Sequence, residues 1–285
     1  MLFRSKSFQL KDYFQDISSF ISEIGHLSLP NVSTLTRMLP ENALNEPLKE
    51  WREWGIHFGD VPAVSDIRDR FRKLMDSLHI YFQIGRQKMI KKFSLEKLVF
   101  LSQCLHGEAH KYWIEMCRVY QQFCGGIIWW NLIDGWPQCS DAVVDYFLEK
   151  KLSYYITMQS QQPILPIILP NLEIWVVNNS KKSIQGSLFI MKLQFSTNQI
   201  KTLDDKTYDH ISVAPNQSNS IDFIRSQPET IAYILKFKYD ELQGQQQQSL
   251  NYVIFPGKQF NPDIYLTFYE KIAEICRLPR HKGKN

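Results

Sequence analysis

The pattern of apolar and polar residues changes character about halfway along the chain. In the first half, residues 64–84 and residues 94–122 carry apolar side chains at intervals of three and four, which predicts two amphipathic helices. In the second half, short apolar or alternating segments lie between turn residues, which predicts antiparallel strands. The predicted strands cover residues 172–179, 187–195, 220–224, 231–239 and 250–255. We therefore expect a mixed α/β first half and an all-β second half.

Weaker signals predict the remaining elements. A short strand is expected over residues 17–22, and a long connection punctuated by prolines over residues 27–93. Helices are expected from Ala142 to Tyr155 and from Pro262 to Leu278, and Ser94 is the expected N-cap of the second long helix. The glutamine-rich segment 243–248 is expected to be a polar loop between two strands.

Residues 125–137 read Gly-Gly-Ile-Ile-Trp-Trp-Asn-Leu-Ile-Asp-Gly-Trp-Pro, an apolar run that ends in tryptophans, an amide and a carboxylate. Buried parallel strands read as apolar runs, and barrels place their chemistry at the carboxyl ends of such strands. Flat indoles beside hydrogen-bonding groups suit a sugar ring, which has apolar C–H faces and a polar rim. An aromatic core strand followed by a turn would read in the same way.

A second motif, Phe20-Ile21-Ser22-Glu23-Ile24-Gly25, lies about a hundred residues upstream. Glu23 would end a strand here, and Gly25 would let the chain turn sharply. Taken alone, the motif equally describes a solvated glutamate in a helix or a turn.

Together the two motifs resemble the C-terminal part of family 2 glycoside hydrolases of the β-mannosidase-like kind. The segment around Glu23 matches the family motif Phe-x-Ser-Glu-x-Gly on barrel strand seven. Residues 126–137 match the strand-eight motif, roughly Gly-x-x-Trp-Trp-x-x-x-Asp-x-Trp-Pro, and Ser140 fits its continuation. The resemblance implies the C-terminal portion of a TIM (β/α)₈ barrel in residues 1–160. It further implies an immunoglobulin-like antiparallel β-sandwich in residues 161–285.

The resemblance also implies a reaction and its residues. The expected activity is retaining hydrolysis of terminal β-linked sugars, with β-mannosides favoured and no metal or cofactor. Glu23 would be the nucleophile, and Trp129 would form part of the wall around the reacting sugar. The further candidates for contact with the sugar are Asn131, Asp134, Trp136 and His57. Their plainer alternatives remain open, namely a turn-forming Asp-Gly, packing tryptophans and an ordinary loop histidine.

The family's acid/base glutamate follows an asparagine at the end of strand four, and this chain begins about twenty residues before Glu23. We therefore expect a C-terminal fragment whose partner is the missing N-terminal part of the enzyme. Loss of a general acid costs roughly 10²–10⁴-fold in rate, so the isolated chain is expected to be inactive or nearly so. The alternative is a non-catalytic carbohydrate-binding or interaction remnant.

Composition and charge argue against several other classes of protein, among them disordered and nucleic-acid-binding proteins. A hydrophobic fraction of 44% is that of a globular protein, and a net charge of +4 does not argue for nucleic acid. The locally basic segment 86–92 is expected to be a solvated face. Five cysteines without a Cys-x-x-Cys pair favour reduced thiols in a cytoplasmic protein. No signal peptide and no membrane span is expected.

Overall fold

The computed structural model describes residues 19–45, 51–59, 69–84, 93–196, 199–225, 227–240, 246–257 and 260–280. The predicted basic face over residues 86–92 lies outside these ranges, as do the first part of the helix predicted from residue 64 and residues 243–245 of the predicted glutamine-rich loop. The loop prediction is wrong for residues 246–248, which begin the strand Gln246–Phe255 and pair with the preceding strand.

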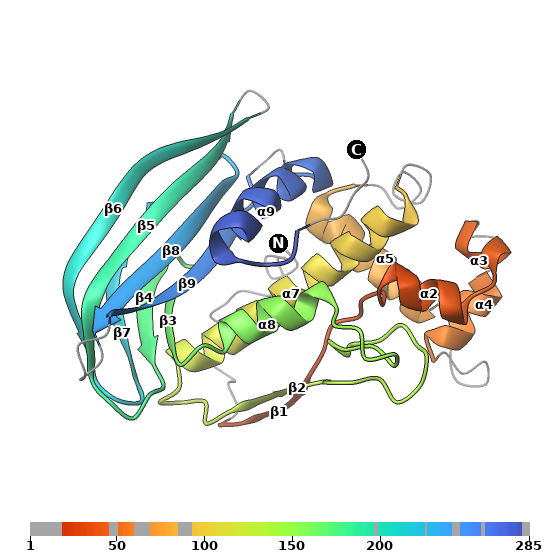
Figure 1. Ribbon diagram of the computed structural model, residues 1–285. Coiled ribbons are helices and arrows are strands. Elements are labelled where there is room, and N and C mark those ends of the chain that lie inside the picture. Colours follow the sequence, from red (N-terminus) through yellow and green to blue (C-terminus); the bar gives the residue numbers. More distant parts are fainter. Residues whose placement is uncertain are drawn as a thin grey trace.

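The described residues form a mixed structure of helices and mainly antiparallel sheet (Figure 1). The helices of the first part are α2 (Val32–Met38), α3 (Glu41–Asn45), α4 (Trp51–His57), α5 (Asp69–Phe82), α7 (Leu95–Val119) and α8 (Leu152–Ser160). Helix α7 runs through the centre of this part. It begins at the predicted cap, where the Ser94 side chain accepts a hydrogen bond from the Lys97 amide at 3.3 Å.

Two antiparallel sheets form the second part. One has the strand order β3 (Ile164–Ile168), β4 (Glu173–Asn178), β7 (Gln217–Phe223). The other has the order β6 (Gln199–Val213), β5 (Ile184–Ser196), β8 (Ile231–Asp240), β9 (Gln246–Phe255). The sheets share a core in which Ile174 and Val176 of the first meet Leu188, Leu235 and Phe237 of the second.

The helices cover the other face of the four-stranded sheet. Leu193, Ile234 and Tyr252 project from this face into a core that also contains side chains of α5 and α7. The C-terminal helix α9 (Pro262–Cys276) packs on the same face and contributes Phe268 (Figure 1). Asn261 caps α9, since its side chain accepts hydrogen bonds from two amides of the first turn. Local capping and a shared apolar face therefore confirm the predicted terminal helix.

Two sequence-based expectations about the first part are wrong. The connection over residues 27–93 contains three short helices, α2 to α4, besides α5. The helix expected from Ala142 does not form, and α8 begins only at Leu152. Asp145 explains the second difference, because its buried carboxylate accepts hydrogen bonds from the amides of Phe147 and Glu149 at 3.0 Å each. These bonds fold the segment into a tight turn instead of a helix.

Helices α7 and α8 pack closely at Gly107. A Cβ atom built on Gly107 would lie 2.6 Å from Cδ1 of Ile156 on α8. We expect Gly107→Ala to destabilise the chain by about 1–3 kcal/mol through overpacking, measured by urea unfolding. The second change Ile156→Val removes the clashing methyl group, so it should recover part of this loss in the double variant. Equal destabilisation by Gly107→Ala in both backgrounds would contradict this explanation.

Candidate functional site

A short parallel pair of strands carries the two sequence motifs. Strands β1 (Ile21–Ile24) and β2 (Ile127–Trp129) pair in register Ile21 with Ile127 and Ile24 with Trp129. The Trp130 amide continues the pairing by donating to the Ile24 carbonyl at 2.6 Å. Since both strands run in the same direction, the exposed Glu23 and the polar end of the tryptophan motif meet at one edge. The strand bounds differ from the predicted 17–22.

The two adjacent tryptophans face different surroundings. The Trp129 indole lies against the ring of His110 on α7, with ring centroids 5.5 Å apart. Trp130 is 53% exposed, as is Ile128, two residues earlier on the strand. Alternation along a strand sends these two side chains to the face opposite Trp129. Trp130 is thus the more accessible indole at the strand end. The strand periodicity was the signal that could have singled it out from the sequence.

The segment after β2 folds back beside the strand ends. The Trp130–Asn131 peptide is cis, and the Asn131 amide donates to the Asp141 carbonyl at 3.3 Å. The buried carboxylate of Asp134 accepts hydrogen bonds through Oδ1 from Ser140 Oγ at 2.5 Å and from Gln138 Nε2 at 2.8 Å. Within the described residues, Asn131 Oδ1 and Asp134 Oδ2 are buried without a hydrogen-bond partner. Both oxygens therefore have hydrogen-bonding capacity that the described residues do not use.

His57 and Trp136 come together, although 78 residues separate them in the sequence. Their rings stack with centroids 6.0 Å apart, and His57 Nδ1 lies 2.8 Å from the Pro137 carbonyl oxygen. The His57 carbonyl also accepts a hydrogen bond from the Cys139 amide at 2.7 Å. These contacts fasten α4 to the segment that follows β2, and they leave the Trp136 indole 40% exposed. Roles of both residues in sugar binding stay predictions.

A second carboxyl group lies close to the end of β1. Oδ2 of Asp141 is 2.5 Å from the position that a Cβ atom of Gly25 would occupy, so any other residue at position 25 would displace the Asp141 carboxyl group. Burial raises the pKa of Asp141, and the nearby charges of Asp134 and Glu23 add to this effect against the opposing charges of Arg70 and Lys151. Asp141 Oδ1 is buried and has no hydrogen-bond partner among the described residues. Asp141 is thus a polar group beside Glu23 whose hydrogen-bonding capacity is unused.

Lys151 lies buried beneath this segment. Its ammonium group donates long hydrogen bonds to the Ser140 carbonyl at 3.3 Å and to Ser28 Oγ at 3.4 Å. Burial lowers the pKa of Lys151, while the charges of Asp134, Asp145 and Asp141 act in the opposite direction. The side chain therefore places one positive charge among carboxylates that would otherwise repel one another.

Two histidines of α7 lie next to Ser28 and extend the cluster of polar side chains around Lys151 into the core. His106 Nδ1 is 2.9 Å from Ser28 Oγ, and its Nε2 is 3.2 Å from Nε2 of His110. Both rings are fully buried. Burial lowers the pKa of His106, and it lowers the pKa of His110 to about 3. Both rings are consequently neutral near pH 7, which allows one Nε2 to donate and the other to accept.

The buried histidines should make stability depend on pH. Their pKa values lie below the ordinary 6.5 in the folded chain, so the unfolded chain binds more protons once the pH falls below 6.5. We expect the free energy of unfolding to decrease from pH 6.5 to pH 5 by about 1–2 kcal/mol per histidine. Urea unfolding across this range would measure it. His110→Gln should flatten the dependence, and an unchanged slope in this variant would contradict the assignment.

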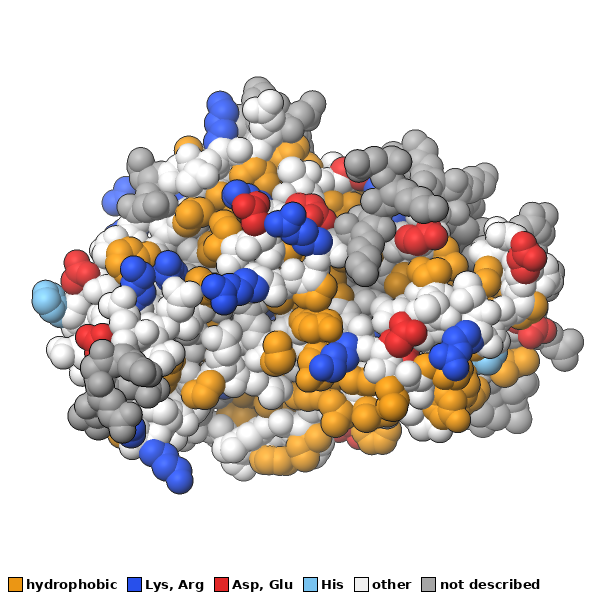
Figure 2. Space-filling model, in the orientation of Figure 1, with side chains coloured by type: hydrophobic (Ala, Val, Ile, Leu, Met, Phe, Trp, Pro, Cys, Tyr) orange, Lys and Arg blue, Asp and Glu red, His pale blue; other side chains and the backbone are white. Residues whose placement is uncertain are grey.

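The strand-end region carries many exposed hydrophobic side chains. Figure 2 shows such side chains along the lower edge of the molecule, where β1 and β2 run in Figure 1. The large exposed hydrophobic residues of this region include Phe20, Ile128, Trp130, Leu132 and Ile133. Parallel strands are ordinarily covered on both faces, so this surface is typical of a face that packs against another part of a protein.

Three negative findings apply to the described part of the chain. It contains no group of three or more histidine, cysteine, aspartate or glutamate side chains that could hold a metal ion. None of its helices is both long enough and apolar enough to cross a membrane. The five cysteines are all buried and none forms a disulfide.

The fold is shared with parts of two solved glycosidases. The structure resembles an exo-chitosanase of Amycolatopsis orientalis over 81% of this chain and 26% of that chain, with a TM-score of 0.56 and 16% identity. It also resembles a β-D-mannosidase of Dictyoglomus thermophilum over 85% of this chain and 28% of that chain, with a TM-score of 0.63 and 21% identity. No protein-family model matches the chain.

Sequence relatives point to the same group. The chain is 26% identical to the β-mannosidase B of Aspergillus clavatus over an alignment of 146 positions, which covers 45% of this chain and 17% of that protein. It is 24% identical to the β-mannosidase B of Emericella nidulans over an alignment of 221 positions, which covers 71% of this chain and 24% of that protein. The resemblance to part of a family 2, β-mannosidase-like enzyme is confirmed. These relatives support a glycosidase-related function, and the chain spans about a sixth to a quarter of their length.

Proposed function

We propose that this chain is the nucleophile-bearing part of a retaining β-mannosidase-like glycosidase, with Glu23 as the nucleophile. The observation that carries the proposal is the parallel pairing of β1 with β2, which brings Glu23 to the same edge as Trp130 and Asn131. Carboxylates at the carboxyl ends of parallel strands, beside aromatic side chains, form the usual chemistry-bearing edge of barrels. β1 and β2 would then be strands seven and eight of a (β/α)₈ barrel.

In this proposal, the carboxylate of Glu23 attacks the anomeric carbon of a terminal β-mannoside and forms a glycosyl ester that water later hydrolyses. Trp130 would pack against the apolar face of the sugar, because its indole is the exposed one of the pair. Asn131 would donate a hydrogen bond to a sugar hydroxyl through its Nδ2, whose contact with the Ile133 carbonyl is exposed and long at 3.4 Å. Trp129 would support the strand end from behind, through its contact with His110.

A retaining mechanism also needs an acid/base group about 5 Å from the nucleophile. We propose that the rest of the barrel supplies this group and covers the exposed hydrophobic side chains around β2. The relatives and solved structures named above extend far beyond the matched region, which supports a larger functional unit. The isolated chain should then hydrolyse unactivated β-mannosides roughly 10²–10⁴-fold more slowly than the complete unit.

The test uses the native protein, isolated from its source with an antibody against α9 and incubated with an activated 2-deoxy-2-fluoro-β-mannoside. Such sugars form the glycosyl ester and hydrolyse slowly, so peptide mass spectrometry can locate the label. We expect the label on Glu23. A label on another carboxylate would overturn the assignment of the nucleophile.

The second candidate function is carbohydrate binding without catalysis. The exposed Trp130 and Trp136 favour it, because exposed indoles bind sugar faces whether or not a bond is cleaved. Binding of a β-mannoside to the native protein without labelling or turnover would favour this alternative.

A further inference from the structure

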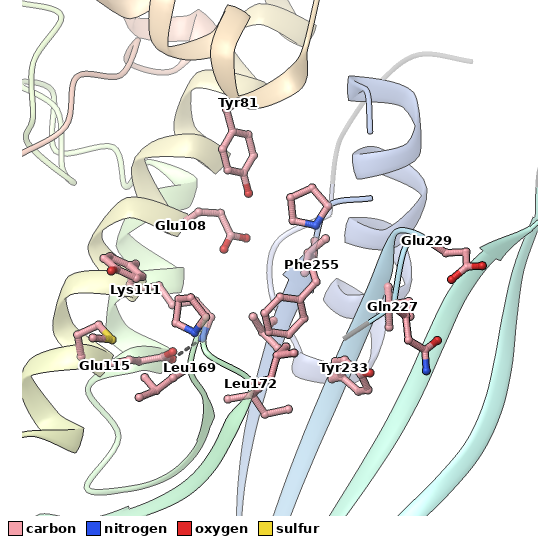
Figure 3. A pocket seen from close by; sticks show the side chains of 18 of the residues that line it. Tyr81, Glu108, Lys111, Glu115, Leu169, Leu172, Gln227, Glu229, Tyr233 and Phe255 are labelled. Atoms are coloured by element: carbon pink, nitrogen blue, oxygen red, sulfur yellow. Dashed lines mark hydrogen bonds and ion pairs between the residues drawn. The ribbon is translucent and has the colours of Figure 1, made fainter. Parts of the chain in front are cut away.

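A separate cavity lies between α7 and the two sheets, and none of the residues that line it belongs to β1, β2 or the segment after β2 (Figure 3). Its volume is about 150 Å³. Its walls come from α7, the turn between β3 and β4, and the strands β8 and β9. The side chains of α7 that line it lie about half a helical turn away from His106 and His110, which face β2. Ligand sites are common at such junctions between two parts of a chain.

The described residues that line the cavity carry a net charge of −1, from three carboxylates and two cations. Its lining contains the carboxylates of Glu108, Glu115 and Glu229, and the cations of Lys111 and Arg225. Lys111 forms an ion pair with Glu115 and also donates to Asn251 Oδ1 at 2.7 Å. Arg225 and Glu229 are both exposed at the rim. The remaining charge is that of Glu108.

Glu108 is held by hydrogen bonds and not by a cation. Its Oε1 accepts from the hydroxyl groups of Tyr252 at 2.9 Å and Tyr265 at 3.0 Å. No lysine, arginine or histidine nitrogen of the described residues lies within ion-pair distance of Glu108. Burial raises the pKa of Glu108, although Lys111 and the two tyrosines act against this effect. A bound cation would therefore meet a carboxyl group that two tyrosine hydroxyl groups already orient and that no cation of the described residues pairs.

Aromatic rings surround the same space. Figure 3 shows the carboxylate of Glu108 directed into the cavity between Tyr81 and Phe255, with Tyr233 further along the wall. Ring faces attract cations, and a carboxylate supplies the counter-charge, so aromatic side chains combined with an acid favour organic ammonium ions. Cavities of about 150 Å³ accept a ligand the size of a single benzene ring.

We propose that this cavity binds a small organic ammonium ion, held by the carboxylate of Glu108 and packed against the rings of Tyr81 and Phe255. The site is distinct from the strand-end region and does not depend on the proposed glycosidase function. It would take a primary or methylated amine that carries one ring or a short alkyl group.

Three probes of nearly the same shape test the proposal on the full 285-residue chain. Benzylamine carries a positive charge at pH 7, benzyl alcohol is neutral, and benzoate is negative. By isothermal titration calorimetry, we expect saturable binding of benzylamine with a dissociation constant on the order of 1 mM. Benzyl alcohol and benzoate should bind at least about 10-fold more weakly. Equal affinity for benzylamine and benzyl alcohol, or no saturable binding of benzylamine up to about 50 mM, would overturn the proposal.

The substitution Glu108→Gln tests whether the negative charge of Glu108, and not its hydrogen bonds to the tyrosines, is needed to bind the ligand. Glutamine keeps an acceptor oxygen for Tyr252 and Tyr265 but removes the negative charge. We expect it to weaken benzylamine binding at least about 10-fold and to leave benzyl alcohol binding unchanged. The matched control is Glu274→Gln, because Glu274 lies on the exposed side of α9 and pairs only with Lys271 among the described residues. This control should change neither the affinity for benzylamine nor the affinity for benzyl alcohol. Unchanged benzylamine affinity in folded Glu108→Gln would refute the site. The comparison of the three probes still decides the question should this variant not fold.

Discussion

Replacing Glu23 by glutamine is expected to abolish glycoside cleavage, with a loss of at least about 10³-fold in turnover. Glutamine has nearly the same size, and the Glu23 side chain is exposed, so the substitution should leave folding unchanged. The amide cannot form the glycosyl ester that a retaining mechanism needs. The loss should therefore appear in kcat and in covalent labelling, while sugar binding changes little.

The experiment compares tagged full-length chains expressed in the source cells and isolated together with whatever completes the barrel. The control is Glu274→Gln, which removes a glutamate from an exposed pair of little energetic value. Activity on an aryl β-mannoside should persist in the control and disappear in Glu23→Gln. Full activity in Glu23→Gln would exclude this residue as the nucleophile. A complete absence of activity in the unaltered chain, with sugar binding retained, would favour the non-catalytic alternative.

Replacing Lys151 by methionine is expected to destabilise the chain by about 3–5 kcal/mol. Lys151 is 0% exposed, and its charge lies among Asp134, Asp141 and Asp145. Removing one partner from a buried group of charges leaves the others uncompensated, which costs about that much. Methionine fills a similar volume, so loss of packing contributes little.

The neighbouring residue provides a matched control. Lys150 is exposed, and its ammonium lies 4.5 Å from the centre of the Tyr154 ring. Lys150→Met should therefore change the free energy of unfolding by no more than about 1 kcal/mol. Urea midpoints of the two variants, compared with that of the unaltered chain, measure both effects. Similar midpoints for all three proteins would show that the Lys151 charge does not stabilise the segment.

Several elements could be predicted from the sequence because their signals are local. Helix α7 begins at its serine cap, α9 begins at Asn261-Pro262, and β8 follows its apolar run from Ile231. Capping side chains act within three residues, and periodicity needs only one turn or one strand. The resemblance of the motifs at Glu23 and at residues 126–137 to a family of glycosidases also rests on short contiguous segments.

Other elements could not be predicted from the sequence, because their stability comes from partners that are distant along the chain. Strand β6 is rich in polar residues, and it forms by pairing along nearly its whole length with β5. Strand β3 contains Pro166, which weakens its strand signal, yet it pairs with β4 along its full length. Helices α2 to α4 are too short to show a clear period, and their apolar side chains, such as Leu35 and Trp54, complete a core built by other helices.

The same division applies to the candidate site. The sequence by itself determined which residue types stand at the ends of β1 and β2, and so the kind of chemistry to expect there. Only the tertiary structure brought His57 to Trp136 and Asp141 to Gly25, and only it buried Lys151, His106 and His110 behind the strands. The physical reason is that burial and charge pairing depend on contacts between segments up to about a hundred residues apart, whereas local sequence patterns report only on the backbone that they occupy.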